Sequence, residues 1–307
     1  MVRTPKPIDN PMKKIIIGSR GSDLALWQAR FVKAELEKCG VETEIKIIKT
    51  QGDQIQHLSF DKMEGKGFFT KEIEASLAAG EIDLAVHSHK DLETTHPAGL
   101  TIAAVSSRED PADLLVIRKE CVDTDQKFSL KLNPVVGTSS ARRKSQMLHF
   151  RPDVTIEDIR GNVPTRLQKL RDGRFDAILL AYAGVKRLKL DMSDFEVIKM
   201  NVKEFVPAPA QGVLGFQVRE DDEELIHVLK KHLNDEAVEK CIHVEREVLR
   251  RFQGGCQMPL GVYCEQQKTG DFEVYAAKAD AWNKPVKRAE CVQPHFEDAV
   301  TGVMRKL

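Results

Sequence analysis

The alternation of short β-branched runs with helical periodicity, which starts at Lys14, constrains the fold of this chain more than any other feature. Strands that alternate with helices are typical of α/β layers whose strands pair in parallel. The pattern predicts a first α/β unit with helices over 24–37 and 71–79 and with strands at 15–17, 44–49, 84–87, 102–105 and 114–117. Ser22 or Asp23 is the expected N-cap of its first helix.

A second α/β unit of similar size follows the first. Its helices are predicted over 141–148 and 164–171, and its strands at 135–136, 154–156 and 177–180. The proline-rich stretch 207–210 breaks this pattern, and we expect the apolar strand 211–218 to return to the first sheet. The remainder is predicted as a small α+β domain, with helices between 220 and 251, a strand at 272–276 and a last helix over 297–304.

The composition is that of a folded protein without an electrostatic preference for nucleic acid. Its 307 residues suffice for two or three domains, and 47 Lys and Arg balance 47 Asp and Glu. Residues 1–12 hold three prolines and no apolar run, which indicates a loose tail rather than a signal peptide. No apolar stretch approaches the ~20 residues that cross a bilayer. The six cysteines form no CxxC pair, which predicts reduced thiols and a cytoplasmic protein.

Polar side chains gather where the predicted strand 84–87 ends. Ser88, Lys90 and Asp91 follow it, and ligands of open α/β sheets bind outside the carboxyl ends of the strands. In a closed pocket this carboxylate can exchange a proton with a substrate amine, although a Lys-Asp pair alone is more typical of a loop ion pair. His87 and His89 alternate along the strand, but no third ligand accompanies them, so we expect no metal site.

Positive charge is concentrated between residues 142 and 187. This segment holds eleven Lys and Arg against five Asp and Glu, an excess of six positive charges. The small-residue loop 137–141 leads into a helix at Arg142 and Arg143, where backbone N–H groups and the helix dipole favour anions. Because arginine can bind a carboxylate through two parallel hydrogen bonds, the segment suits a small substrate with many carboxylates. A solvated charged face is the alternative, and RNA is a weaker one because aromatics are few.

Cys256 stands in a glycine-bounded loop, FQGGCQMPLG over 252–261, that follows a long predicted helix. Glycines permit close approach of the backbone, and a loop cysteine near a helix end can be an exposed nucleophile. Most single cysteines are inert core residues. This loop by itself therefore leaves both interpretations open.

Six motifs in the same order resemble the porphobilinogen deaminase (hydroxymethylbilane synthase) family, from about residue 15 to about residue 263. They are Ser19-Arg20 with residues 24–29, the Gly-Lys-Gly-Phe-Phe stretch 65–69, the segment 86–91, residues 136–140 with Arg142-Arg143, the Arg-Gly-Asn-Val segment 160–163, and Gly254-Gly255-Cys256. Together they are far more specific than any one of them.

The resemblance implies a fold of three domains. Two would be α/β lobes like those of periplasmic binding proteins, with mixed, largely parallel sheets and the active cleft between them. The third would be a small α+β C-terminal domain that carries the cofactor cysteine. The implied boundaries are 1–108 with 210–228 for the first domain, 109–209 for the second and 229–307 for the third.

The resemblance also implies a transferase of tetrapyrrole and heme synthesis. It would join four porphobilinogen molecules head to tail, each losing ammonia, and release hydroxymethylbilane. Cys256 would hold a dipyrromethane cofactor through a thioether, and Asp91 would be the catalytic acid that assists the departure of ammonia and stabilises the positive nitrogens. A cytoplasmic monomer that hands its product to uroporphyrinogen-III synthase is expected, with no nucleic-acid or membrane partner.

Family positions that hold the acetate and propionate groups of cofactor and substrate match arginines and polar residues of this sequence. The cofactor-binding set is Lys90, Ser88, Thr138, Ser139, Ser140, Arg142, Arg143, Arg160 and Gly161. The substrate-binding set is Arg20, Ser22, Gln28, Arg166 and Arg187. Lys66 and Phe69 match a mobile loop over the cleft. Since each pyrrole carries two carboxylates, a chain of six rings has about a dozen negative charges, which would balance the positive segment.

Two departures from the family pattern stand out. Leu92 is followed by Glu93-Thr94-Thr95, where the family usually has a short apolar residue and a proline, so the turn beyond the acid is expected to differ. Beyond Tyr263 the similarity becomes faint. The acid and the cysteine are both retained.

Two other classes of protein fit parts of the sequence. A non-enzymatic binding protein with two α/β lobes would explain the arginines without needing Cys256 or Asp91. A cysteine hydrolase or transferase would pair the thiol with a histidine. A covalent dipyrrole on the purified chain would exclude the first class, and alkylation of Cys256 in the native protein would favour the second.

Overall fold

The computed structural model describes residues 13–50, 70–255 and 257–307. Within these residues the chain divides into two compact units. Unit 1 holds residues 13–50, 70–108 and 213–239, and unit 2 holds residues 109–212 and 240–307.

Unit 1 is built on a five-stranded mixed sheet in the order β2-β1-β3-β10-β4. Its strands are β1 (Ile15–Ser19), β2 (Thr43–Ile47), β3 (Leu84–Ser88), β4 (Leu100–Val105) and β10 (Leu214–Arg219). β1 pairs in parallel with β2 and β3, whereas β10 runs antiparallel between β3 and β4. The strand after the proline-rich stretch therefore returns to the first sheet, as the sequence predicted.

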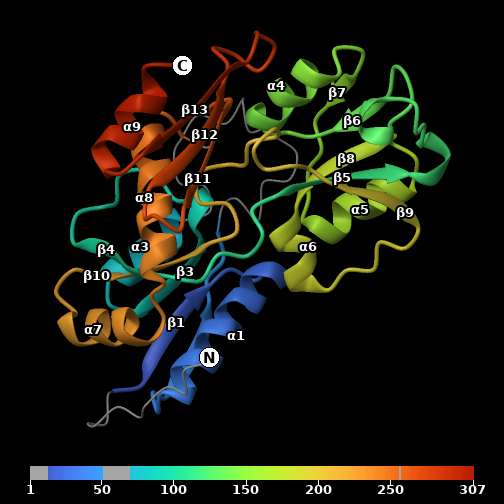
Figure 1. Cartoon of the computed structure of the whole chain (residues 1–307). Helices are drawn as coiled ribbons and strands as arrows, with labels where there is room; N and C mark the ends of the chain where they lie inside the picture. Colours follow the sequence, from blue (N-terminus) through green and yellow to red (C-terminus); the bar gives the residue numbers. More distant parts are fainter. Residues whose placement is uncertain (1–12, 51–69, 256) are drawn as a thin grey trace. The chain divides into compact units, whose positions relative to one another are not determined.

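Helices cover both faces of this sheet because its buried strands are apolar on both sides. The side chains of Ile15 and Ile17 share a core with α1 (Asp23–Lys38) and α7 (Glu223–His232). Ile16 faces the other way, toward the core that α3 (Lys71–Ala78) completes. Figure 1 shows α1, in blue, alongside β1.

Unit 2 contains a second five-stranded mixed sheet, in the order β7-β6-β8-β5-β9. Its strands are β5 (Asp113–Arg118), β6 (Val135–Gly137), β7 (Thr155–Glu157), β8 (Ala177–Ala181) and β9 (Phe195–Lys199). β6 pairs in parallel with β7 and β8, and β5 runs antiparallel between β8 and β9. One core contains Met147 of α4 (Ala141–Phe150), and the other contains residues of α5 (Val163–Arg171) and α6 (Tyr182–Leu188).

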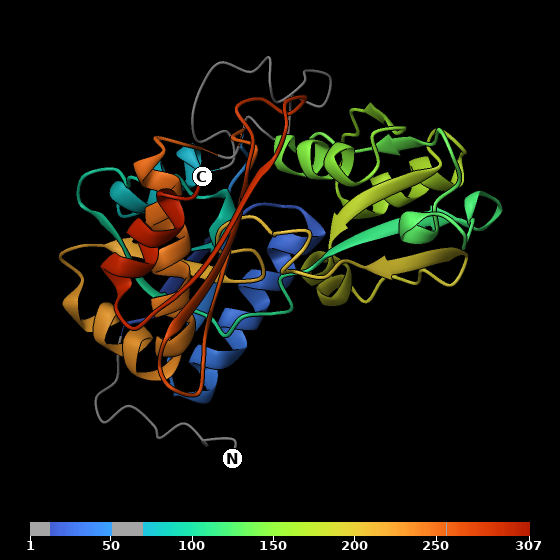
Figure 2. The ribbon, with the colours of Figure 1, turned by 45° about the horizontal axis from the view of Figure 1, so that its top comes forward.

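The rest of unit 2 is a three-stranded antiparallel sheet with two helices. The strands β11 (Leu260–Gln266), β12 (Phe272–Lys278) and β13 (Lys287–Gln293) pair in that order, as labelled in Figure 1. Figure 2 shows the same sheet, in orange to red, nearly edge-on. α8 (Glu236–Arg251) and α9 (Phe296–Met304) share one apolar core with this sheet. The predicted α+β character of this region is confirmed.

The prediction of mixed, largely parallel sheets is confirmed, since four of the five strands of each five-stranded sheet run in the same direction. Two other predictions about the fold need correction. The strand predicted at 114–117 with the first series is β5, and it pairs with β8 and β9 in the second sheet. The sequence reading also missed β9, β11, β13 and α6. β9 and β13 are edge strands with mostly exposed residues and lack a continuous apolar run.

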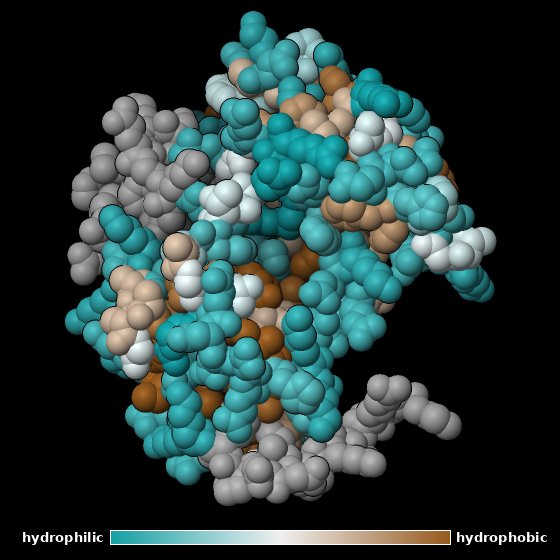
Figure 3. All heavy atoms as spheres, turned by 90° about the vertical axis from the view of Figure 1, so that its left-hand side faces the viewer, coloured by the Kyte–Doolittle hydropathy of each residue, from teal (hydrophilic) through white to brown (hydrophobic). Residues whose placement is uncertain are grey.

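The cysteine side chains that the structure describes lie in the interior, and the surface visible in Figure 3 is largely polar. Cys39, Cys121, Cys241, Cys264 and Cys291 are buried. Hydrophilic side chains predominate on the face shown in Figure 3. None of the helices in the described ranges is long and apolar enough to span a membrane.

Candidate active site

The Asp91 turn, residues 88–92, follows directly on β3. A single 3₁₀ turn, His89–Asp91, is held against β10 because His89 N donates to Val213 O at 2.9 Å. A Cβ atom at Gly215 of β10 would lie 3.1 Å from His89 Cδ2 and 3.2 Å from Leu92 Cδ1, so the close packing of this turn depends on glycine. Leu92 is buried, whereas Asp91 is exposed. Its carboxylate is therefore accessible to a bound molecule.

A buried polar chain lies behind the Asp91 turn. Gln217 Nε2 donates to Glu74 Oε1 at 3.0 Å, so the amide oxygen of Gln217 faces His87 Nε2, also at 3.0 Å. That oxygen can only accept, and His87 must therefore carry its proton on Nε2. Burial lowers the pKa of His87 to about 4, which keeps the imidazole neutral. His87 thus stabilises the β3–β10 pairing, and no group that could hold a metal is found in the described parts of the chain.

The predicted substrate residues of unit 1 surround the ends of β1 and β3. Gln28 of α1 is buried and donates to Ser88 Oγ at 2.8 Å, which joins two of the predicted residues directly. Ser22 is the N-cap of α1, where its hydroxyl accepts from Ala25 N at 3.4 Å, so of the two expected caps the serine is the one observed. Arg20, after β1, and Lys90 are both half-buried.

The arginine loop, residues 138–143, connects β6 to α4 in unit 2. Ser139 Oγ donates to Ile159 O at 2.9 Å and accepts from Ile159 N at 3.1 Å, which ties the loop to the chain after β7. Thr138 is buried, and its hydroxyl accepts from Ser140 N at 3.3 Å. Ser140 is the N-cap of α4 but makes no side-chain cap bond. The loop therefore presents serines at the positive end of a ten-residue helix.

Arg142 and Arg143 are buried against Asp113, a residue that the sequence reading missed. Arg142 Nη1 donates to Asp113 Oδ2 at 2.6 Å, and Arg143 donates to Asp113 Oδ1 through Nη2 at 2.7 Å and Nε at 3.1 Å. Gln211 Nε2 adds a fourth donor at 2.9 Å. Burial would raise the pKa of Asp113, but the charges and hydrogen bonds of the two arginines lower it well below its ordinary value.

The remaining predicted residues of unit 2 lie after β7 and on α6. Gly161 has a φ of +108°, and a Cβ there would lie 2.7 Å from Thr165 Cγ2, so glycine is required at this turn. Arg166 Nε donates to Gly161 O at 2.8 Å, which sets the guanidinium beside the half-buried Arg160 turn. Arg187 donates to Gly212 O at 2.7 Å, and burial lowers its pKa to about 10.

The predicted cofactor residue Cys256 and the predicted loop residues Lys66 and Phe69 lie outside the described residues. On the near side of the cysteine position, Gly254 N donates to Leu249 O at 3.0 Å, after α8. A Cβ at Gly254 would lie 2.7 Å from Met258 Sδ, so this glycine permits a close approach. On the far side, Met258 N donates to Gly255 O at 3.0 Å.

Glu245 is a second buried carboxylate that the sequence reading missed. Its Oε2 accepts from Ala210 N at 2.6 Å and its Oε1 from Cys264 N at 2.8 Å, so α8 joins the proline-rich stretch to β11. Ala210 has a φ of +60°, a left-handed conformation that this bond helps to hold. The sequence contains an indication that both acids are buried. Asp113 opens an apolar strand, and Glu245 lies among the buried residues of α8. A charge in an apolar pattern requires a partner.

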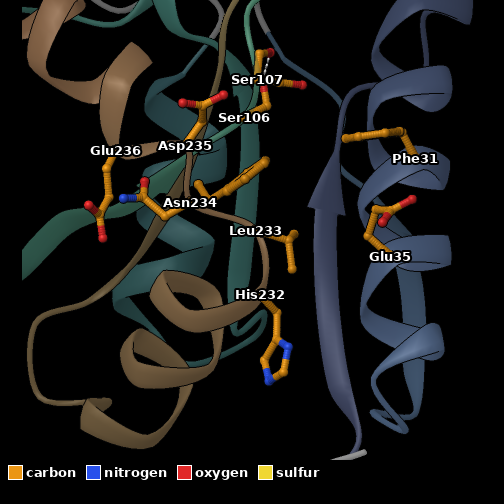
Figure 4. A pocket seen from close by; sticks show the side chains of 10 residues that line it. Phe31, Glu35, Ser106, Ser107, His232, Leu233, Asn234, Asp235 and Glu236 are labelled. Carbon is orange, nitrogen blue, oxygen red and sulfur yellow. Dashed lines mark hydrogen bonds between the residues drawn. The ribbon is translucent and has the colours of Figure 1, made fainter. Parts of the chain in front are cut away.

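A separate pocket of about 390 Å³ lies within unit 1. Figure 4 shows Phe31 and Glu35 of α1 on one side and the connection between α7 and α8 on the other, with His232, Asn234 and Asp235. Its lining contains none of the predicted site residues. The structure instead gathers those residues at strand ends, with Gln28, Ser88 and Asp91 in unit 1 and the arginine loop in unit 2.

The chain matches two family models. The one described as "Porphobilinogen deaminase, dipyromethane cofactor binding domain" matches residues 15–227, and the one described as "Porphobilinogen deaminase, C-terminal domain" matches residues 239–301. A porphobilinogen deaminase of a Nitratiruptor species is 46% identical over 263 residues, which cover 86% of this chain and 82% of that protein. One of Chloroherpeton thalassium is 44% identical over 274 residues, covering 87% and 84%. One of Chlorobaculum tepidum is 43% identical over 284 residues, covering 92% and 88%.

Proposed function

The chain belongs to the porphobilinogen deaminase family, and from this we propose that it is a hydroxymethylbilane synthase. It condenses four porphobilinogen molecules head to tail, with release of ammonia, in tetrapyrrole biosynthesis. The observation that carries the proposal is the similarity itself, which extends over both family domains and exceeds 40% identity to curated relatives.

Asp91 is the catalytic acid in this proposal. An amine leaves readily only as ammonia, after protonation. A carboxylic acid next to it can deliver that proton, and the carboxylate that forms can stabilise the cation that remains. The exposed position of Asp91 at the end of β3 suits this role, because a substrate can approach the carboxylate directly. Gln28 and Ser88, which hydrogen-bond to each other, provide polar contacts at the same end of β3.

The dipyrromethane cofactor, bound through Cys256, would supply the pyrrole carbon to which the first substrate unit is added. The donors of unit 2 fit its carboxylates. Arg142 Nε is buried and has no hydrogen-bond partner among the residues that the structure describes, and Ser139 and Ser140 lie at the N-terminus of α4. Three further cations follow: Arg160 on the loop after β7, Arg166 on α5 and Arg187 on α6. They bind further acetate and propionate groups.

The remaining expectations complete the proposal. The three-domain boundaries, 1–108 with 210–228, 109–209 and 229–307, describe the division into two lobes and a cofactor-bearing domain. Lys66 and Phe69 belong to a loop over the substrate. We also propose a cytoplasmic monomer that passes its product to uroporphyrinogen-III synthase.

Denaturing mass spectrometry of the purified chain tests the function. The expected result is a mass excess of two porphobilinogen-derived pyrroles, together with consumption of added porphobilinogen. Cys256→Ser should have the bare chain mass, whereas Cys264→Ser, a change at a buried core thiol, should keep the adduct. A bare mass for the unmutated chain that does not consume porphobilinogen would remove the proposal.

A further inference from the structure

Unit 2 buries two guanidinium groups against one carboxylate. The side chain of Asp113 is 0% exposed, and those of its partners Arg142 and Arg143 are 5% and 8% exposed. Both arginines are within ion-pair distance of the same carboxylate, at 2.6 and 2.7 Å. The Asp113 cluster, defined as these three side chains, therefore carries one net positive charge.

Two neighbouring cations, one on α4 and one at its C-terminal end, have carboxylate partners of their own. Lys144 Nζ lies 2.7 Å from Asp158 Oδ1, and Arg151 Nη2 lies 2.6 Å from Asp153 Oδ2. In the described ranges, the other hydrogen-bond partners of the cluster are neutral. Arg142 also donates to Val206 O and Arg143 to Leu179 O, and Gln211 donates to Asp113.

One donor of the cluster also remains unused among the described residues. Arg142 Nε is buried without a hydrogen-bond partner in that part of the chain. A buried charge and a buried donor each cost free energy unless a partner is supplied. The N-terminus of α4, which begins at Ala141, adds a partial positive charge at the same place. A bound anion would therefore balance the net positive charge and accept a hydrogen bond from Arg142 Nε.

We propose that Asp113 is the charge-balancing residue of the arginine loop. It neutralises one of the two buried guanidinium groups, which lets the chain fold before the cofactor is attached. It leaves one positive charge and the Nε donor of Arg142 for a carboxylate of the bound oligopyrrole. The identity of that anion rests on the proposed function, whereas the demand for an anion rests on the cluster alone.

The test is Asp113→Asn in two backgrounds, the Cys256 chain that carries the dipyrrole and the unloaded Cys256→Ser chain. Asparagine keeps the shape and one of the two acceptor oxygens, so the change removes the charge and the acceptor for one set of donors. The melting temperature of the unloaded chain should fall by several degrees more than that of the loaded chain, because carboxylates of the ligand replace the lost charge. An equal fall, or a larger fall in the loaded chain, would overturn the inference.

Stabilisation by acetate is a second measurement, and it does not require a bound dipyrrole. It tests the role of Asp113 even if Asp113→Asn retains no dipyrrole. Unloaded chains are melted in sodium acetate and in sodium chloride of equal ionic strength. Acetate should raise the melting temperature of Asp113→Asn more than that of its parent, since the variant has a larger unbalanced charge. Equal responses of the two chains would contradict the proposal.

Asp176→Asn is the matched control. Asp176 lies in the same unit, accepts from Val135 N at 2.8 Å and pairs with Lys131 at 2.8 Å, one acid to one base. Its substitution should lower the melting temperature equally in both backgrounds and should leave the acetate response unchanged.

Arg142→Met covers the case in which Asp113→Asn does not fold. It leaves Asp113 and Arg143 as a neutral pair, so the acetate response should fall below that of the parent, and an unchanged response would overturn the inference. The two proposals fail separately. A missing adduct on the unmutated chain counts against the function and leaves the acetate comparison standing, whereas equal acetate responses count against the role of Asp113 alone.

Discussion

The Asp91 turn and the arginine loop each follow a strand of a mixed five-stranded sheet, but the turn exposes its charged group and the loop buries its charged groups. Each follows a strand, β3 or β6, that has a parallel neighbour in its sheet. The turn exposes its carboxylate and is backed by the neutral His87–Gln217 pair. The loop buries its arginines and fixes them with the carboxylate of Asp113.

The difference follows from the two proposed roles, which are proton transfer by Asp91 and carboxylate binding by the arginines. An acid that transfers a proton to a substrate has to contact it, and the exposed position of Asp91 permits this. A guanidinium that holds a carboxylate keeps its charge throughout, so it can be buried if a fixed counter-charge and hydrogen bonds are provided. Substitutions in the turn should therefore affect turnover, and substitutions in the loop should affect stability and ligand retention.

The largest expected effect is that of Asp91→Asn on turnover. Loss of a general acid typically lowers the rate about 10²- to 10⁴-fold, and we expect a loss of this size in steady-state consumption of porphobilinogen. The melting temperature should hardly change, because Asp91 is exposed. Asp221→Asn, at another exposed acid of unit 1, should retain activity. Near-normal turnover of Asp91→Asn would contradict the proposed chemical role of the Asp91 turn.

The pH dependence of stability separates the two regions next. Burial lowers the pKa of His87 from its ordinary 6.5 to about 4, so the unfolded chain binds this proton at a higher pH than the folded chain. Stability contributed by the neutral ring is present above about pH 6.5 and is lost as the pH falls toward 4. Between pH 7.5 and pH 5 the unmutated chain should lose roughly 2 kcal/mol more free energy of unfolding than His87→Asn.

Asp113 should contribute nothing to that change. Its pKa is lowered from an ordinary 3.8, so its stabilising effect is complete above that pH and is lost only in stronger acid. Urea unfolding at the two pH values measures the difference, with His227→Asn, at an exposed position of α7, as the control for loss of a histidine. Parallel pH profiles for the unmutated chain and His87→Asn would show that the ring behind the Asp91 turn titrates as it does in the unfolded chain.

The smallest expected effects are those of two serine substitutions in the arginine loop. Ser139→Ala removes a hydroxyl that bonds both backbone groups of Ile159, and we expect a cost of about 1–2 kcal/mol in free energy of unfolding. Ser140→Ala removes a hydroxyl without a cap bond and should cost less than about 0.5 kcal/mol. Urea denaturation of the two variants compares them directly. Similar costs would mean that the tie to Ile159 does not hold the loop in place.

Most of the secondary structure and the positions of the polar loops could be predicted because they depend on local pattern. The 15–17 run, the 24–37 periodicity and the loop before Arg142 each correspond to an observed element or junction. Strand partners could not be assigned in the same way. The 114–117 run looks like its neighbours in the first series, and only its pairing with β8 and β9 places it in the second sheet.

Three features follow from local sequence pattern alone. They are the α/β layering, the location of Ser88 and Asp91 at a strand end, and the accumulation of arginine after residue 142. Tertiary structure alone decided which charges meet. Gln211 and Asp113 are 98 residues apart in sequence, and Arg143 and Asp113 are 30 apart. Such contacts depend on how strands cross and pair, and the energy of a buried charge depends on partners that no local pattern specifies.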